Sequence, residues 1–225
     1  MKINHRRYAH LKTIITNPPL RRPLTTALAW IGIISLLAMA NLVQAQVLSS
    51  NALVAALRKG GYVVVIRHAN SPSTLPTRQT ANPDNVKLER QLDSVGSKDA
   101  TALGRGLKDL KIPVGEVIVS TAYRATETAR LAQLPNPKLQ EELGEGMGSM
   151  QAISDAQADW LKERVKHLPK ETNTILVTHN PNLAKAFPGW GATVLPGEAV
   201  VLDLDSKGAT RVVGRIKPGE WPHFK

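Results

Sequence analysis

The chain has 225 residues and a formal net charge of +11, but the charge is unevenly distributed. Residues 1–45 contain six basic residues and no acidic one, which leaves 23 basic and 18 acidic residues in the remainder. The basicity is therefore mainly a property of the N-terminus, and it does not indicate that the rest of the chain binds nucleic acid. Because there is no cysteine, disulfide bonds are excluded and the hydrophobic core must hold the fold together.

The N-terminal 45 residues have the pattern of a signal peptide. A basic stretch precedes an apolar run at 27–40, and residues 43–45 (Val-Gln-Ala) are of the kind that signal peptidase accepts. We expect cleavage before Gln46, export to the periplasm, and a single domain over residues 46–225. The apolar run is shorter than the ~20 residues of a spanning helix. An uncleaved membrane anchor facing the periplasm is the alternative.

Helical and strand patterns alternate after the apolar run. Apolar runs predict buried strands, helical spacing predicts helices, and two runs around a turn at 205–208 predict a hairpin. The expected strands are 62–68, 116–120 and 174–178, the helices 52–59, 97–110, 123–134, 154–168 and 182–187, and the hairpin strands 199–204 and 210–216. This order predicts an α/β fold, a three-layer α/β/α sandwich with a mostly parallel central sheet.

Each buried strand ends in residues suited to phosphate chemistry. Arg67 and His68 end the first strand, Ser120 ends the second with Arg124 soon after, and His179 follows the third. Because the carboxyl ends of parallel strands meet at one edge of a sheet, we expect these side chains to converge on one crevice.

The residue types at this edge fit the hydrolysis of a phosphomonoester. Arg67 and Arg124 can hold phosphate oxygens through bidentate, charged hydrogen bonds. A neutral His68 can attack phosphorus, and His179 can stabilise charge on the phosphoryl oxygens. A carboxylic acid is still needed to protonate the leaving oxygen. A metal hydrolase with His68 and His179 as ligands is a weaker alternative, because no further ligand stands at metal-binding spacing from either.

Several strings of residues resemble the histidine phosphatase superfamily, whose fold is phosphoglycerate-mutase-like. They are Arg67-His68, residues 120–129 (Ser-Thr-Ala-Tyr-Arg-Ala-Thr-Glu-Thr-Ala), residues 177–180 (Val-Thr-His-Asn) and the stretch 91–104 between the first two. The resemblance spans residues 62–182. It implies that His68 is phosphorylated during turnover, that Arg67, Arg124 and His179 complete the phosphate pocket, and that no metal or other cofactor is needed.

The resemblance also suggests an acid and further substrate contacts. The family acid stands in a Leu-x-Glu stretch before a glycine, so Leu139-Gln140-Glu141 points to Glu141. Glu142 and Glu145 are close rivals, because the glycine at 144 falls one residue early. Asn70 and Ser71 follow the histidine and are expected to contact phosphate. Three bases in or beside the polar loop at 70–90 could also face an anionic substrate: Arg78, Lys87 and Arg90.

We therefore expect a metal-independent phosphomonoesterase of the histidine acid phosphatase type. A phosphomutase and a catalytically silent module that binds a phosphorylated envelope component are the alternatives. The expected partner is a phosphorylated small molecule or an envelope glycan, since small lipopolysaccharide-core heptose phosphatases look similar, including the Arg-His-Ala and Thr-His-Asn strings. No nucleic-acid partner is expected, and a membrane is expected only through an uncleaved N-terminal segment.

Overall fold

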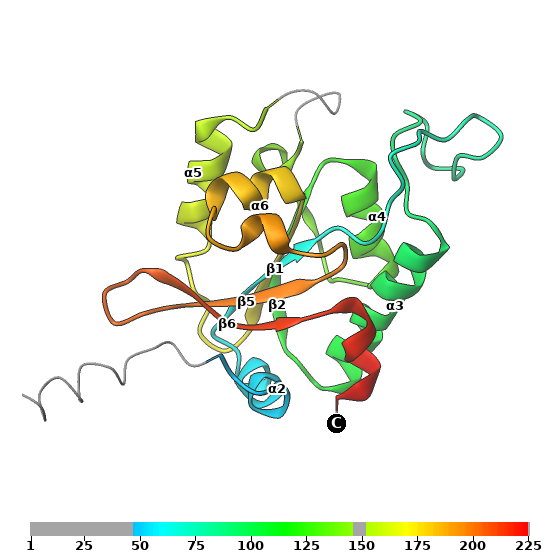
Figure 1. The fold of residues 1–225 in the computed structure, drawn as a ribbon. Coiled ribbons are helices and arrows are strands. Elements are labelled where there is room, and N and C mark those ends of the chain that lie inside the picture. The colour runs from blue at the N-terminus through cyan, green and yellow to red at the C-terminus, as the bar shows by residue number, and fades with distance from the viewer. Residues whose placement is uncertain (1–46, 146–151, 225) are drawn as a thin grey trace, which may run out of the picture. The chain divides into compact units, whose positions relative to one another are not determined.

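Six strands form one mixed sheet in the computed structural model, which describes residues 47–145 and 152–224 (Figure 1). The strands are β1 (Val63–Arg67), β2 (Val114–Ser120), β3 (Lys138–Gln140), β4 (Asn173–Thr178), β5 (Ala199–Leu204) and β6 (Thr210–Ile216). They lie in the order β3-β2-β4-β1-β5-β6. The first four of this order are parallel, whereas β5 is antiparallel to β1 and β6 to β5. The predicted α/β fold and the C-terminal hairpin are confirmed.

Helices cover both faces of this sheet (Figure 1). The α-helices are α2 (Ser50–Lys59), α3 (Ser94–Asp109), α4 (Tyr123–Leu131), α5 (Asp155–Arg164) and α6 (Asn180–Ala186), and the 3₁₀ helices are η1 (Glu141–Leu143), η2 (Gly191–Thr193) and η3 (Pro218–His223). One hydrophobic cluster joins the sheet to α2, α3, α4 and η3, and a second joins it to α5 and α6. The predicted three-layer arrangement follows from these two clusters.

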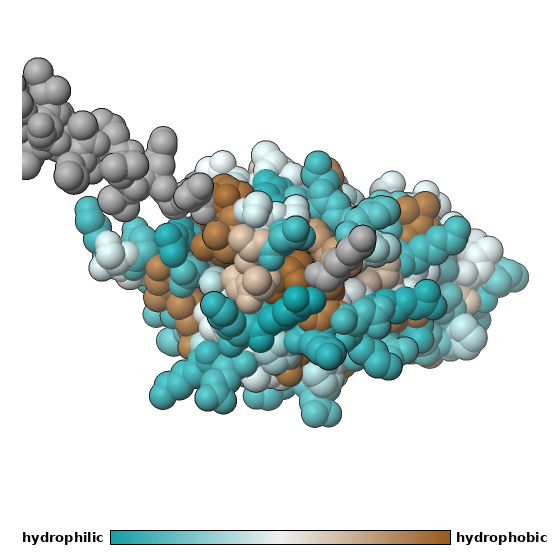
Figure 2. All heavy atoms as spheres, turned by 90° about the horizontal axis from the view of Figure 1, so that it is seen from below, coloured by the Kyte–Doolittle hydropathy of each residue, from teal (hydrophilic) through white to brown (hydrophobic). Residues whose placement is uncertain are grey.

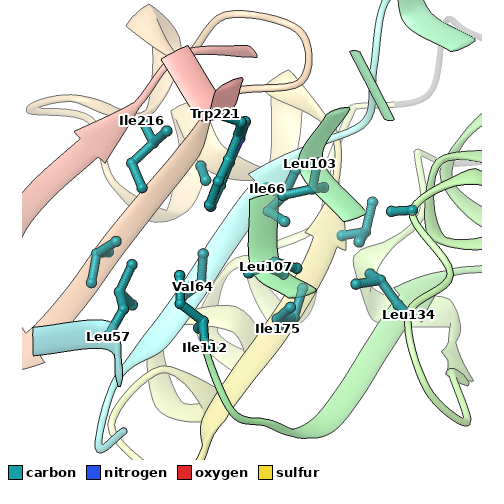
Figure 3. Close-up of a cluster of buried hydrophobic side chains, with 14 of the residues drawn as sticks. Leu57, Val64, Ile66, Leu103, Leu107, Ile112, Leu134, Ile175, Ile216 and Trp221 are labelled. Atoms are coloured by element: carbon teal, nitrogen blue, oxygen red, sulfur yellow. The ribbon is translucent and has the colours of Figure 1, made fainter. Parts of the chain in front are cut away.

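Strand β1 supplies side chains to both layers. Val64 and Ile66 point into the cluster that also contains Leu103 and Trp221 (Figure 3), whereas Val63 and Val65 belong to the opposite cluster. All four valine and isoleucine side chains are at most 3% exposed. Alternate residues of a strand point to opposite faces, so a strand between two helical layers must be apolar throughout. Burial of each such side chain contributes about 1.5–3 kcal/mol.

Hydrogen bonds at the helix starts explain the observed boundaries. Asp93 caps α3 by accepting a hydrogen bond from the backbone N–H of Gly96 at 2.8 Å, so this helix begins before the predicted residue 97. Ser154 and Gln157 form a capping box that starts α5 where the sequence places it. The predicted helix 123–134 ends earlier, at Leu131.

The described residues contain no helix long and apolar enough to cross a membrane. The expected signal peptide, residues 1–45, lies outside the described part of the chain. The described residues, 47–145 and 152–224, belong to one compact unit.

The face that Figure 2 shows mixes hydrophobic and hydrophilic residues. A groove of about 690 Å³ lies between α3 and η3, with Leu110, Trp221 and Phe224 among its lining residues. It is lined by none of the predicted site residues, so the candidate site must be located from the strand ends and not from cavity size.

Candidate active site

The carboxyl ends of adjacent parallel strands bring the two predicted histidines together. Strands β1 and β4 pair with Arg67 opposite Thr178. The residues that directly follow the two strands, His68 and His179, therefore also stand side by side. Their ring centroids are 5.1 Å apart. Ser120 ends β2, which pairs with β4 on the other side. The convergence expected from the sequence is therefore present in the structure.

Arg124, in the first turn of α4, connects the two imidazole rings. Its Nε lies 3.3 Å from Nε2 of His68, and its Nη2 lies 3.0 Å from Nδ1 of His179. The side chain is buried, and burial lowers its pKa while the nearby carboxylate of Glu145 raises it. A guanidinium group has only donors, so both ring nitrogens that face it must accept.

His68 is held with its reactive nitrogen toward the pocket. Its Nδ1 lies 2.8 Å from the carbonyl oxygen of Ala69, which can only accept, so Nδ1 carries the proton and Nε2 keeps its lone pair. The side chain is 3% exposed. Burial, followed by the positive charge of Arg124, lowers the pKa of His68 to about 3. The ring is therefore neutral over the physiological pH range.

His179 has the opposite arrangement of ring hydrogen bonds. Its Nδ1 accepts from Arg124, so Nε2 carries the proton and donates to Oγ of Ser120 at 2.7 Å. Burial and the charge of Arg124 also lower the pKa of this fully buried histidine well below its usual value. The Ser120 hydroxyl can accept from Nε2 or donate to it, so it can serve either tautomer.

Arg67 is anchored by a loop that precedes β5. Its Nη1 donates to the carbonyl oxygen of Val194 at 2.9 Å, while its buried Nε has no hydrogen-bond partner in the part of the chain that the structure describes. Burial lowers the pKa of Arg67, and the negative charge of Glu145 opposes that shift. The guanidinium is thus charged, partly anchored, and left with an unused donor.

The carboxylate in this pocket belongs to Glu145, the rival that the glycine spacing left open. Its Oε2 lies 2.5 Å from Nη2 of Arg124, and its Oε1 lies 3.5 Å from Nδ1 of His179. Glu141, the acid expected from the resemblance, is exposed, and its side chain makes no hydrogen bond within the described residues. Glu142 accepts a hydrogen bond from Gln140 instead. The η1 turn buries Leu143 and turns the chain, so the residue that reaches the pocket comes four positions after the expected one.

The two predicted phosphate contacts after His68 are partly engaged within the protein. Nδ2 of Asn70 donates to Oδ2 of Asp93 at 2.7 Å. Oγ of Ser71 is buried without a hydrogen-bond partner. The carbonyl oxygens of Ser71 and Pro72 accept from Arg90, at 2.7 Å and 2.8 Å respectively. The loop therefore brings a third arginine to the edge of the site.

Of the three bases considered in the loop, Arg90 influences the pKa values of the pocket side chains. Arg90 contributes to the lowered pKa of all four pocket side chains, although burial is the main cause in each: Arg67, His68, Arg124 and His179. Arg78 and Lys87 are exposed. The sequence offered no signal that separates Arg90 from them.

The charges of the site fit a phosphomonoester better than a metal ion. His68, Glu145 and His179 offer ligand atoms within 4.8 Å of one another, as a metal site would. However, both imidazole lone pairs and the carboxylate already face the guanidinium of Arg124, which a cation would have to displace. Three arginines, one carboxylate and two neutral histidines leave a net charge of +2. That charge balances a phosphomonoester dianion.

Comparisons with known proteins give the family and the fold of the chain. A family model described as histidine phosphatase superfamily (branch 1) matches residues 63–175, about half of the chain. The structure is similar to that of the protein histidine phosphatase SixA complexed with tungstate, with 17% identity, a TM-score of 0.52, and coverage of 71% of this chain and 98% of that one. It is also similar to the SixA protein of Nakamurella multipartitia, with 19% identity, a TM-score of 0.50, and coverage of 71% and 96%. A search of curated protein sequences finds no match.

Proposed function

Since the chain belongs to the histidine phosphatase superfamily, we propose that it hydrolyses phosphomonoesters through a phosphohistidine formed on His68. The observation that carries this proposal is the orientation of that ring. Nδ1 donates to the neighbouring carbonyl, and the lone pair of Nε2 points into a pocket that contains Arg124. A pKa of about 3 keeps the nucleophile neutral at working pH.

In the first step, Nε2 of His68 attacks phosphorus and the bond from phosphorus to the ester oxygen breaks. Arg67 and Arg124 hold the phosphoryl oxygens, where charge is stabilised in the transition state. His179 joins them in the tautomer that carries its proton on Nδ1, with the Ser120 hydroxyl donating to Nε2. Glu145 takes up a proton after the substrate displaces its carboxylate from Arg124, and it gives that proton to the leaving oxygen. An acid in this role contributes about 10²–10⁴-fold to the rate of esters with poor leaving groups.

In the second step, water attacks the phosphohistidine and the bond from phosphorus to Nε2 breaks. The carboxylate of Glu145 accepts the proton of the water, so it returns to the protonated form used in the first step. Inorganic phosphate leaves, and His68 recovers its lone pair. The cycle needs no metal ion or organic cofactor.

The proposal is tested with full-length protein, an aryl phosphate and a metal chelator. We expect hydrolysis that the chelator does not affect and that His68→Ala abolishes. Enzyme that is denatured at alkaline pH should carry a phosphoryl group on His68, detected by mass spectrometry and lost on acid treatment. Loss of hydrolysis with chelator would instead support a metal enzyme. Binding of phosphate without turnover would support a silent module, and transfer of the phosphoryl group to a second hydroxyl of the substrate would support a mutase.

We also propose where the enzyme acts and on what class of substrate. The signal-peptide pattern of residues 1–45 supports export to the periplasm. An exported phosphatase would meet phosphorylated small molecules and phosphorylated envelope glycans. Fractionation of cells that produce the full-length protein tests the location, and the protein should be found in the periplasm or on the membrane that faces it.

A further inference from the structure

A short turn that leads into the pocket is held by side chains from three other elements. Three consecutive backbone carbonyls, those of Glu142, Leu143 and Gly144, accept hydrogen bonds from side chains. The donors are Oγ1 of Thr178 to Leu143 at 2.9 Å, Nε2 of Gln157 to Gly144 at 2.9 Å, and Nδ2 of Asn182 to Glu142 at 3.1 Å and to Gly144 at 3.2 Å. The next residue is Glu145.

Asn182 donates hydrogen bonds to the first and the last of these carbonyls, those of Glu142 and Gly144. It is fully buried in α6, three residues after His179, and its Nδ2 bonds two carbonyls, while its Oδ1 has no partner among the described residues. An unpaired buried oxygen is costly, so the contribution of this side chain comes from the two bonds that it donates.

The turn determines where the carboxylate of Glu145 lies. That carboxylate is 2.5 Å from Nη2 of Arg124 and 3.5 Å from Nδ1 of His179. These are the groups that would hold a phosphoryl oxygen. The carboxylate therefore occupies the place of a substrate oxygen in the resting protein and stands beside the reacting atoms when an anion displaces it.

We propose that Asn182 is a positioning residue for Glu145, acting through the carbonyls of Glu142 and Gly144. The inference rests on the proposed function for the acid role of Glu145, but the competition between Glu145 and a bound anion does not depend on turnover. Asn182 thereby couples the strand end that carries His179 to the carboxylate that works beside it.

The first test measures binding of inorganic phosphate to full-length variants by calorimetry at neutral pH. Glu145→Gln should bind phosphate about tenfold more tightly, because Arg124 is released from a charge-assisted bond. Asn182→Ala should bind it roughly threefold more tightly, since the carboxylate is no longer held in place. An Asn182→Ala affinity equal to that of wild type would overturn the inference, as would an unchanged affinity in Glu145→Gln.

The chain offers a matched control in Asn173. It is also fully buried, its Nδ2 donates to the carbonyls of Leu57 at 2.8 Å and Pro113 at 2.9 Å, and its Oδ1 has no partner. It stands at the start of β4, the end remote from His179. Asn173→Ala should lose stability much as Asn182→Ala does and leave phosphate affinity unchanged. An equal rise in affinity in both variants would show a merely structural effect.

The second test compares aryl phosphates with good and poor leaving groups. Asn182→Ala should lose kcat about tenfold on poor leaving groups and little on activated ones, because only the former need the acid. Asn173→Ala should change kcat by the same factor on esters with poor and with good leaving groups. If Asn182→Ala does not fold, Thr178→Val removes the bond to Leu143, and Thr178→Ser should restore the wild-type pattern.

The two tests separate failure of the inference from failure of the proposed function. Hydrolysis by wild type, with a selective loss in Glu145→Gln but not in Asn182→Ala or Thr178→Val, would overturn the inference alone. Absence of hydrolysis in wild type would overturn the proposed function. The phosphate affinities would then still decide whether Asn182 positions Glu145.

Discussion

The ends of β1 and β4 place two histidines at the same level of the sheet but bond their rings in opposite ways. His68 uses Nδ1 to donate to its own neighbouring carbonyl, so its Nε2 lone pair faces the pocket. His179 uses Nε2 to donate to Ser120, so its Nδ1 faces Arg124. Both are buried and neutral. The partner of the remote nitrogen, and not burial or charge, therefore distinguishes the proposed nucleophile from the proposed phosphate contact.

Removal of each ring in turn is the most direct test of the different roles proposed for the two histidines. His68→Ala should lower hydrolysis of an aryl phosphate by about 10⁴-fold or more, because no other nucleophile replaces it. His179→Ala should lower kcat by about 10²–10³-fold, as loss of one charge-stabilising contact does. Rapid-quench experiments should detect phosphoenzyme only in His179→Ala. Phosphoenzyme in His68→Ala, or equal losses in both variants, would remove the distinction.

The shared burial of the two rings predicts a common effect of pH on stability. An unfolded histidine has a pKa near 6.5, whereas that of folded His68 is about 3, so below pH 6.5 the unfolded chain binds a proton that the folded chain does not. Stability should therefore fall as the pH drops from 6.5 toward 3. His68 alone should account for about 2 kcal/mol between pH 7.5 and pH 5.

Urea unfolding at several pH values measures this effect. His179 adds a loss in the same direction, because its folded pKa is lowered too. In His68→Gln, the decline between pH 7.5 and pH 5 should be about 2 kcal/mol smaller than in wild type. Parallel stability curves for wild type and His68→Gln would show that burial of this ring does not set the pH dependence.

Removal of the Ser120 hydroxyl, which bonds Nε2 of His179, should have a smaller effect on kcat than removal of either ring. Ser120→Ala removes the hydroxyl that can donate to Nε2 of His179 when Nδ1 carries the proton toward a phosphoryl oxygen, so that tautomer is less favoured. We expect kcat to fall roughly tenfold with little change in KM, because a phosphoryl oxygen loses a well-oriented contact in the transition state. Nitrogen chemical shifts of His179 should report the changed tautomer population. Unchanged shifts and unchanged kcat would show that Ser120 does not orient the ring.

The strand ends explain why the convergence of Arg67, His68, Arg124 and His179 could be predicted from sequence. Each lies in or just after a short apolar run, and parallel pairing alone brings such positions to one edge. His68 and His179 follow this rule directly. Arg124 follows it through the start of α4. No long-range information beyond the order of the elements was needed.

The sequence left three glutamates as candidates for the acid, because tertiary hydrogen bonds decide which of them reaches the pocket. Thr178 and Asn182 hold the turn before Glu145 from positions distant in the chain, and no local periodicity records that contact. The sequence does not predict the edge strand β3 either, because this strand has three residues and its Leu139 is 60% exposed. Such a short strand has too few buried apolar residues to give a recognisable strand pattern.

The sequence predicts a polar loop at 70–90, but it does not predict the attachment of this loop and of Leu92 to α4. Glu127 accepts from Asn82 Nδ2 at 2.7 Å and from the backbone N–H of Leu92 at 3.2 Å, and Glu89 accepts from the backbone N–H of Tyr123 at 2.9 Å. These bonds join residues more than thirty positions apart. They place Arg90 beside the histidine pair.

Replacing Arg90 tests whether this loop acts on the anion that the two histidines share. The side chain adds one of three positive charges to a pocket with one carboxylate, so Arg90→Gln should raise KM about five- to tenfold and leave kcat nearly unchanged. Arg90→Lys keeps the charge but loses the fork that bonds the carbonyls of Ser71 and Pro72, so it should recover only part of the affinity. Arg78→Gln is the matched control, since Arg78 is exposed in the same loop and should change neither constant. The KM of Arg90→Gln should also depend less on salt, because a charge close to the substrate is gone. Equal KM values for Arg90→Gln and Arg78→Gln would limit the anion pocket to the strand ends and α4.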